Sequence, residues 1–188
     1  PPAVAFPHTR VGANPPPPPN KKRAGASHFR PPPNPTTIPE NFVFFLTQKL
    51  LPLLRNSASS ENPARVINIG SIDGLKTPSF DNFSYGPSKA AVHHLTRVLA
   101  AHLIKDHIIV NAIAPGPFPT WMLSSGVGFG GKTEGHGVNW DLVGQGNPSG
   151  RVGTLEDISG LAIFLSSRAG AYVVGQTIAC DGGMVTVS

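Results

Sequence analysis

The sequence predicts an α/β fold built on a doubly wound parallel sheet. Two observations support this prediction. From about residue 41 onward, short β-branched runs alternate with longer segments of helical periodicity, which is the order typical of βαβ units. Residues 1–40, in contrast, hold 13 of the 21 prolines, so they cannot donate the backbone hydrogen bonds of a helix or sheet. We therefore expect a proline-rich disordered segment at 1–40 and a folded part at 41–188.

The proline-rich segment also carries most of the charge of the chain. Its net charge is +4, out of +5 for the whole sequence, so the folded part is electrically ordinary. The segment would suit an SH3-type or WW-type ligand, or a basic arm around Lys21, Lys22 and Arg23. We favour an unstructured extension without such a role, because composition is the only support for either function. No nucleic-acid partner is expected.

The folded part opens with a predicted helix and a strand. Residues 42–55 are rich in apolar side chains and predict a helix, which Pro52 should kink or shorten. Residues 64–71 read ARVINIGS and predict a short β-branched strand that ends at a glycine and a serine.

A long helix and a second strand follow. Residues 84–104 predict an amphipathic helix, because their apolar side chains recur at intervals of three and four: Ala91, Val92, Leu95, Val98, Leu99 and Leu103. Residues 107–116 predict a strand that Pro115 and Gly116 stop.

The remaining elements are a loop, a helix and a last strand. Residues 120–150 contain many glycines and predict a loop with one short helix. Residues 154–167 predict a helix with Thr154 as N-cap and acidic residues in its first turn. Residues 175–183 predict a closing strand and turn.

Three residues carry the chemistry that the sequence suggests: Ser71, Tyr85 and Lys89. Tyr85 and Lys89 are four positions apart at the start of a predicted helix, so both side chains lie on one face. An unperturbed phenol has a pKa of about 10 and is a poor acid-base catalyst near neutrality. We expect the Lys89 ammonium to lower the pKa of Tyr85 toward neutrality. Ser71, at the end of a strand, could aim its hydroxyl at the carbonyl oxygen that Tyr85 protonates.

The Tyr-x-x-x-Lys spacing alone is a weak signal, because such a pair is more often a solvated helix face. Here the chain has only 2 tyrosines, and Tyr85 follows a strand ending in Gly-Ser by 14 residues. This combination makes a catalytic interpretation much stronger.

Four blocks of the chain resemble consecutive blocks of the short-chain dehydrogenase/reductase family: VINIGSIDGL, SYGPSKAAVHHLTRVLA, IIVNAIAPGPFPT and GQTIACDGG. The resemblance covers about residues 42–188. Within the family, ENPARVINIGS, YGPSKAA and APGPFP are most similar to the rhamnolipid-biosynthesis type of 3-oxoacyl acyl-carrier-protein reductase. The resemblance implies a Rossmann-like fold. It also implies that Tyr85 is the general acid or base, that Lys89 lowers its pKa and holds the nicotinamide ribose, and that Ser71 orients the substrate carbonyl.

The resemblance further implies a cofactor contact after the second strand. Pro115, Gly116 and Thr120 resemble the family's PGxxxT segment, which brings backbone groups and a threonine hydroxyl to the nicotinamide carboxamide. Phe118 would contribute through its backbone. Seen without the family, the Pro-Gly pair would be a plain turn. Asp181-Gly182-Gly183 resembles the family's closing turn, for which we expect a role in folding and subunit packing.

The sequence departs from the family pattern at its beginning. No TGxxxGxG turn, which receives the cofactor pyrophosphate in the family, is present. We therefore expect a truncated Rossmann-like sheet that lacks its first strands, and a weakened binding of NADP or NAD. The strand at 65–69 should then expose an edge, so we expect instability, aggregation or a partner.

The expected function is an NAD(P)(H)-dependent oxidoreductase that reduces a small-molecule carbonyl substrate, such as a 3-oxoacyl compound, or oxidises an alcohol. The alternative is a non-catalytic fragment that associates with related subunits through the sheet edge and long helices. A homo-oligomer follows from the resemblance. The choice between NAD and NADP stays open, because the residues that decide it follow a strand absent from this sequence.

Several other classes of protein are disfavoured. No run approaches the roughly 20 apolar residues of a membrane-spanning helix, so no membrane partner is expected. Cys180 is the only cysteine, so no internal disulfide can form, and a cytoplasmic location is expected. No metal is expected, because His93 and His94 point to different helix faces and no carboxylate or cysteine completes a ligand set.

Overall fold

The computed structural model describes residues 39–77, 83–120, 123 and 138–187. The chain divides into two units, residues 1–31 and 32–188, and every described residue belongs to the second. Of the disordered segment expected at 1–40, residues 1–38 lie outside the described residues, and residues 39–40 are the first residues of a helix. The fold of the described residues is therefore the fold of the second unit.

The described part forms a three-stranded parallel sheet in the order β1-β2-β3. Strand β1 spans Ala64–Ile69, β2 spans Ile108–Pro115 and β3 spans Thr177–Cys180. In the register of the sheet Ile69 lies opposite Ile113, and Pro115 lies opposite Cys180. The three strands therefore end at a common edge, which is where parallel sheets bind ligands.

The central strand β2 is buried almost throughout, which explains its apolar sequence. Seven of its eight residues are buried. Ile108 and Val110 belong to the hydrophobic core beside α2. Because side chains alternate along a strand, Ile109 and Ile113 face the opposite side of the sheet. A parallel strand covered on both faces is expected to be a continuous β-branched run rather than an alternating one.

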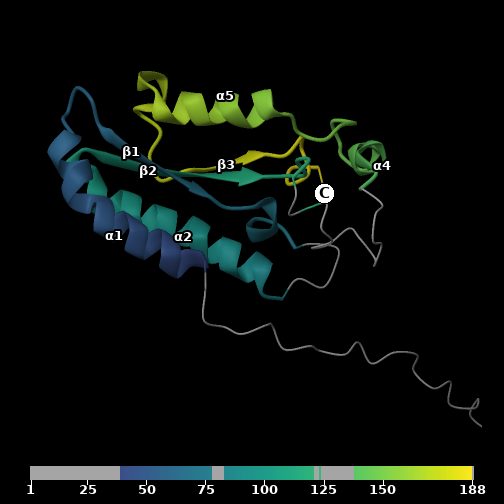
Figure 1. The fold of residues 1–188 in the computed structure, drawn as a ribbon, viewed down its shortest axis with the longest axis horizontal. Helices are drawn as coiled ribbons and strands as arrows, with labels where there is room; N and C mark the ends of the chain where they lie inside the picture. Colours follow the sequence, from purple (N-terminus) through teal and green to yellow (C-terminus); the bar gives the residue numbers. More distant parts are fainter. Residues whose placement is uncertain (1–38, 78–82, 121–122, 124–137, 188) are drawn as a thin grey trace, which may run out of the picture. The chain divides into compact units, whose positions relative to one another are not determined.

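Helices cover both faces of this sheet (Figure 1). Helix α1 (Pro39–Ser57) and helix α2 (Tyr85–Leu103) pack together on one face, and α5 (Leu155–Ser166) lies on the other. The core between α2 and the sheet is formed by Leu99, Ala100, Leu103, Ile108 and Val110. The prediction of a doubly wound parallel sheet is thus confirmed for the part of the fold that the chain covers.

Pro52 was expected to kink or shorten the first helix, and the expectation of a shorter helix is wrong. Helix α1 continues past Pro52 to Ser57. A proline lacks the N–H that would bond to the carbonyl four residues earlier, which belongs to Gln48. Both Pro52 and Gln48 are exposed, so water can hydrate that carbonyl. The break in hydrogen bonding therefore costs too little to end the helix.

One edge of the sheet and several helix faces leave apolar side chains exposed. Among the described strands, β1 pairs only with β2. Ile69 at its end is 53% exposed, and on α1 Phe42 and Leu53 are 70% and 68% exposed. This exposure agrees with the expected free edge and identifies the surfaces on which further chain could pack.

The C-terminal half adds the predicted short helix and a capped helix. Helix α4 (Trp140–Gln145) lies in the glycine-rich stretch, of which residues 121–122 and 124–137 are outside the described part. Thr154 caps α5 and forms a capping box with Asp157, as the sequence predicted for the N-cap. No helix in the described ranges is both long enough and apolar enough to cross a bilayer.

Candidate active site

The fold brings the three predicted catalytic residues together at the carboxyl edge of the sheet. Ser71 follows the end of β1 and caps the short 3-10 helix η1 (Ile72–Gly74). Tyr85 opens α2, and Lys89 lies one turn later on the same helix. The Tyr85 phenol hydrogen-bonds with the Ser71 side chain. Ser71 and Tyr85, which are 14 positions apart in sequence, are thus joined by a hydrogen bond.

Ser71 is fixed by its own backbone and side chain. Its Oγ accepts a hydrogen bond from the backbone N–H of Asp73 at 3.2 Å. Its own backbone N–H donates to Nε2 of His93 at 3.4 Å. The residue is extended and 8% exposed. Because the Oγ already accepts one bond, its O–H is left to donate toward Tyr85 or a substrate oxygen.

The pKa of Tyr85 departs from its ordinary value in the direction opposite to the prediction. Burial raises the pKa of the phenol, the hydrogen bond with Ser71 opposes this, and the charge of Asp73 raises it further. The expected lowering by Lys89 does not accompany these effects; its ammonium lies 5.4 Å from the Tyr85 ring centroid and donates to the carbonyl of Ile69. Tyr85 is therefore a protonated phenol at neutral pH, the form that can give up a proton.

Lys89 reaches past the tyrosine to the end of β1. Its ammonium donates to the carbonyl oxygen of Ile69 at 3.1 Å. Burial lowers the pKa of the Lys89 ammonium below its ordinary value. An ammonium has three donors, so two remain for other oxygens near this edge.

The segment after β2 is held against the C-terminal turn. The backbone N–H of Gly116 donates to the carbonyl of Cys180 at 2.9 Å, and a Cβ on Gly116 would lie 2.7 Å from the Cα of Asp181. Pro115 is the last residue of β2, and the Phe118 ring packs on Gly153. Thr120 Oγ1 accepts from the N–H of Leu123 at 3.3 Å. The proposed cofactor residues of this segment thus form a rigid turn beside the same sheet edge.

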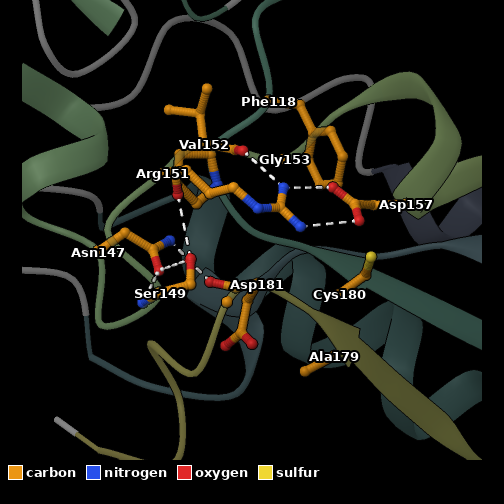
Figure 2. Close-up of a pocket in the computed structure, with 12 residues that line it drawn as sticks. Phe118, Asn147, Ser149, Arg151, Val152, Gly153, Asp157, Ala179, Cys180 and Asp181 are labelled. Atoms are coloured by element: carbon orange, nitrogen blue, oxygen red, sulfur yellow. Dashed lines mark hydrogen bonds and ion pairs between the residues drawn. The ribbon is translucent and has the colours of Figure 1, made fainter. Parts of the chain in front are cut away.

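A pocket of about 280 Å³ lies behind this turn (Figure 2). Pro117 and Phe118 line it, together with Asn147, Ser149, Arg151, Val152, Gly153, Asp157, Ala179, Cys180, Asp181 and Gly182. Figure 2 shows the Arg151 guanidinium bridging to both oxygens of Asp157. This ion pair holds the pKa of Asp157 far below its usual range. Ser71, Tyr85 and Lys89 do not line the pocket, so it is separate from the three predicted catalytic residues.

The closing turn Asp181-Gly182-Gly183 is held by hydrogen bonds to the Asp181 carboxylate. The two oxygens of Asp181 accept from the N–H groups of Gly183 and Val185 at 2.9 and 2.8 Å. Gly182 and Gly183 have positive φ angles of 66° and 96°, a conformation that side-chain-bearing residues rarely adopt. The turn thereby keeps its backbone close to Gly116.

His93 lies beside the site, although no such place was predicted for it from the sequence. In the sequence it stands out only as a possible metal ligand, yet the residue is 2% exposed and its ring accepts a hydrogen bond from the backbone of Ser71. A signal was present: His93 follows Tyr85 and Lys89 by eight and four positions, which places all three on one helix face.

Comparison with known proteins assigns the family. A family model described as Enoyl-(Acyl carrier protein) reductase matches residues 41–185. The chain belongs to the short-chain dehydrogenase/reductase family. The matched residues include the three strands of the sheet, the three predicted catalytic residues and the closing turn.

The chain is similar to individual members over about half of their length. It is 48% identical over 141 residues to a rhamnolipids biosynthesis 3-oxoacyl-[acyl-carrier-protein] reductase of Pseudomonas aeruginosa, covering 75% of this chain and 52% of the relative. The structure of a Pseudomonas aeruginosa RhlG/NADP active-site complex matches with a TM-score of 0.68 and 46% identity, covering 77% of this chain and 54% of that one. A gluconate 5-dehydrogenase from Burkholderia cenocepacia in complex with NADP and tartrate matches with a TM-score of 0.64 and 28% identity, covering 78% and 52%.

Proposed function

We propose that the chain is the catalytic part of an NAD(P)(H)-dependent oxidoreductase that reduces a carbonyl compound. The observation that carries this proposal is the hydrogen-bonded group at the carboxyl edge of the sheet, in which Tyr85 contacts Ser71 and Lys89 lies one helical turn away. Membership of a family of oxidoreductases supports the same conclusion.

The residues at this edge fit the nicotinamide end of the cofactor. Lys89 keeps two ammonium donors beyond its bond to Ile69, and the Tyr85 phenol can bond to a second oxygen; both suit the hydroxyl groups of a ribose. The rigid turn at Pro115, Gly116, Phe118 and Thr120 would face the carboxamide. A bound nicotinamide cofactor would supply the hydride that reduces the carbonyl carbon.

The protein residues would deliver the proton. Ser71 would donate a hydrogen bond to the substrate carbonyl oxygen, because its Oγ already accepts the Asp73 N–H. Tyr85 would then protonate that oxygen as negative charge develops on it. Burial keeps Tyr85 protonated at neutral pH, which is the state that this role requires. In the reverse direction the same phenol, once deprotonated, would take the proton of an alcohol.

We propose a 3-oxoacyl thioester as the substrate class. The relative with 48% identity is named as a 3-oxoacyl-[acyl-carrier-protein] reductase, whereas a relative with 36% identity is named as a 2-dehydro-3-deoxy-D-gluconate 5-dehydrogenase. The chain contains no TGxxxGxG turn and spans about half of these relatives. We therefore expect weaker binding of the cofactor than a chain with the pyrophosphate site would show.

The test uses the purified 188-residue chain with NADPH and a 3-oxoacyl thioester. Oxidation of NADPH is followed by its absorbance, and cofactor binding by its fluorescence. Turnover should be present in the unsubstituted chain and lost in Tyr85→Phe, while folding by circular dichroism is unchanged. Tyr172→Phe is the matched control, since Tyr172 is fully exposed and distant in sequence from the site. Equal turnover in Tyr85→Phe and the control would refute the reductase assignment.

A second function is a non-catalytic fragment that associates with related subunits. The exposed apolar side chains of α1 favour it, as does the edge of β1 that no other described strand pairs with, because such surfaces mark sites where more protein packs. Titration with NADPH separates the two functions. Saturable binding with turnover supports the enzyme, whereas no binding together with assembly in sedimentation analysis supports the fragment.

A further inference from the structure

His93 is a buried polar residue that the mechanism above does not use. It lies on α2, four residues after Lys89 and eight after Tyr85, and only 2% of it is exposed. Its neighbour His94 points to the exposed side of the same helix. The site therefore has a third polar side chain on its helix face, one turn further into the core.

The imidazole of His93 fits closely against the chain that leaves β1. Nε2 accepts the backbone N–H of Ser71 at 3.4 Å. A Cβ on Gly70 would overlap the imidazole, and a Cβ on Gly74 would lie 2.9 Å from its Cε1. Glycines on both sides of Ser71 thus leave the space that the ring fills. The imidazole ring of His93 therefore packs directly against the backbone on both sides of Ser71.

The protonation state of His93 follows from its contacts. Burial lowers the pKa of the imidazole; the charges of Lys89 and Arg97 lower it further, whereas the backbone of Gly74 acts in the opposite direction. A neutral ring whose Nε2 accepts a hydrogen bond carries its proton on Nδ1. Nδ1 is buried, and no hydrogen bond of standard geometry reaches it among the described residues, although a backbone hydrogen bond with Gly74 is the contact that raises the pKa of the ring. A leucine could fill the same space, but it would offer no acceptor to the backbone N–H of Ser71.

Three hydrogen bonds in a row tie the end of β1 to α2. The Asn68 side chain donates to Thr96 Oγ1 at 2.9 Å, Lys89 donates to the carbonyl of Ile69 at 3.1 Å, and Ser71 donates to His93 at 3.4 Å. All the helix residues involved lie on the face that begins with Tyr85. The last of these bonds is the one that reaches the proposed catalytic serine.

We propose that His93 is a positioning residue, whose Nε2 holds the backbone of Ser71 so that the serine hydroxyl meets the phenol of Tyr85. This inference rests on the proposed function, because it assigns His93 to that same site. His93 itself touches neither substrate nor reacting atoms. It acts through the backbone of Ser71.

The first test compares two substitutions of His93 in the 188-residue chain. His93→Leu removes the acceptor and should lower the turnover number on the order of 100-fold, the effect of misplacing a catalytic group by about 1 Å, with little change in KM. His93→Gln places a carbonyl oxygen near the position of Nε2 and should restore most of the loss. His94→Leu is the matched control on the exposed side and should match the unsubstituted chain. Equal turnover in His93→Leu and His94→Leu would overturn the inference.

A double substitution tests whether His93 acts through Ser71. Ser71→Ala alone should reduce turnover, and adding His93→Leu should reduce it little further, because the group that His93 positions is already gone. Effects that multiply would show that His93 acts by another route and would overturn the inference.

A readout without turnover separates this inference from the proposed function. Hydrogen exchange of the Ser71 amide, followed by NMR, should be slow in the unsubstituted chain and in His93→Gln, and faster in His93→Leu. Unchanged exchange in His93→Leu overturns the positioning role whether or not the chain is a reductase. If the exchange changes as expected but no chain turns over NADPH, the reductase proposal fails and the contact between His93 and Ser71 stands.

Discussion

The ammonium of Lys89 donates to the carbonyl oxygen of Ile69 at 3.1 Å, which fixes the helix lysine to the last residue of β1. The same ammonium is 5.4 Å from the ring centroid of Tyr85. Lys89 therefore holds the strand end and the helix start in one arrangement. It does so without lowering the pKa of Tyr85, which burial raises.

Replacing Lys89 by methionine should remove this connection while keeping the aliphatic packing. We expect the proposed reductase turnover to fall on the order of 100-fold or more, since the group that would orient cofactor and phenol is lost. Turnover is measured with NADPH and a 3-oxoacyl thioester. Lys105→Met is the matched control, because Lys105 is exposed on the 3-10 helix Ile104–Asp106. Equal turnover in the two variants would contradict the prediction.

The order of helices and strands could be predicted because the burial of one or both faces of an element sets the spacing of its apolar residues. Helix α2 shows its three/four spacing since one face meets β2, and β2 is continuously apolar since both of its faces are covered. The pair Tyr85 and Lys89 could be predicted for the same reason, because a spacing of four places side chains on one helix face.

Other features depend on contacts that no local pattern encodes. The raised pKa of Tyr85 results from burial and from Asp73, which belongs to a different element. The role of His93 depends on the backbone of Ser71, 22 positions earlier. The continuation of α1 through Pro52 depends on whether water reaches a carbonyl, which the sequence of the helix alone does not decide.

The stability of the chain in mild acid should depend on His93. Its folded-state pKa lies below the ordinary value of 6.5. As the pH falls below 6.5, the unfolded chain binds a proton there that the folded chain does not, so the free energy of unfolding decreases. Urea titrations between about pH 7 and 5 should show a steeper loss in the unsubstituted chain than in His93→Gln. Carboxyl groups contribute equally to both chains, so parallel curves would contradict the prediction.

Asn111 should be a major source of stability for the junction between β2 and β3. It is 1% exposed; its Nδ2 donates to the carbonyl of Val173 at 2.7 Å, and its Oδ1 accepts from the N–H of Gln176 at 2.9 Å. Asn111→Ala leaves both backbone groups without these partners, at about 1–3 kcal/mol for each one that stays buried. Urea unfolding should show the loss, while Asn56→Ala on the exposed side of α1 should change little. A loss no larger than that of the control would contradict the prediction.

Two glycine-to-alanine substitutions should change stability in opposite directions. A Cβ on Gly116 would lie 2.7 and 2.8 Å from the Cα and Cβ of Asp181, atoms fixed by the backbone of the closing turn. Gly116→Ala should therefore cost about 1–3 kcal/mol through overpacking. Gly160 lies inside α5 with nothing within 4 Å of an added Cβ, so Gly160→Ala should stabilise the helix by about 0.5–1 kcal/mol.

The two variants serve as controls for each other, because both remove the same backbone freedom from the unfolded chain. Their urea midpoints should move apart around that of the unsubstituted chain. A Gly116→Ala chain at least as stable as Gly160→Ala would show that the turn after β2 and the closing turn are not in contact in solution. The close packing of the turn after Pro115 against the closing turn, which we propose as part of the cofactor side of the site, would then be absent.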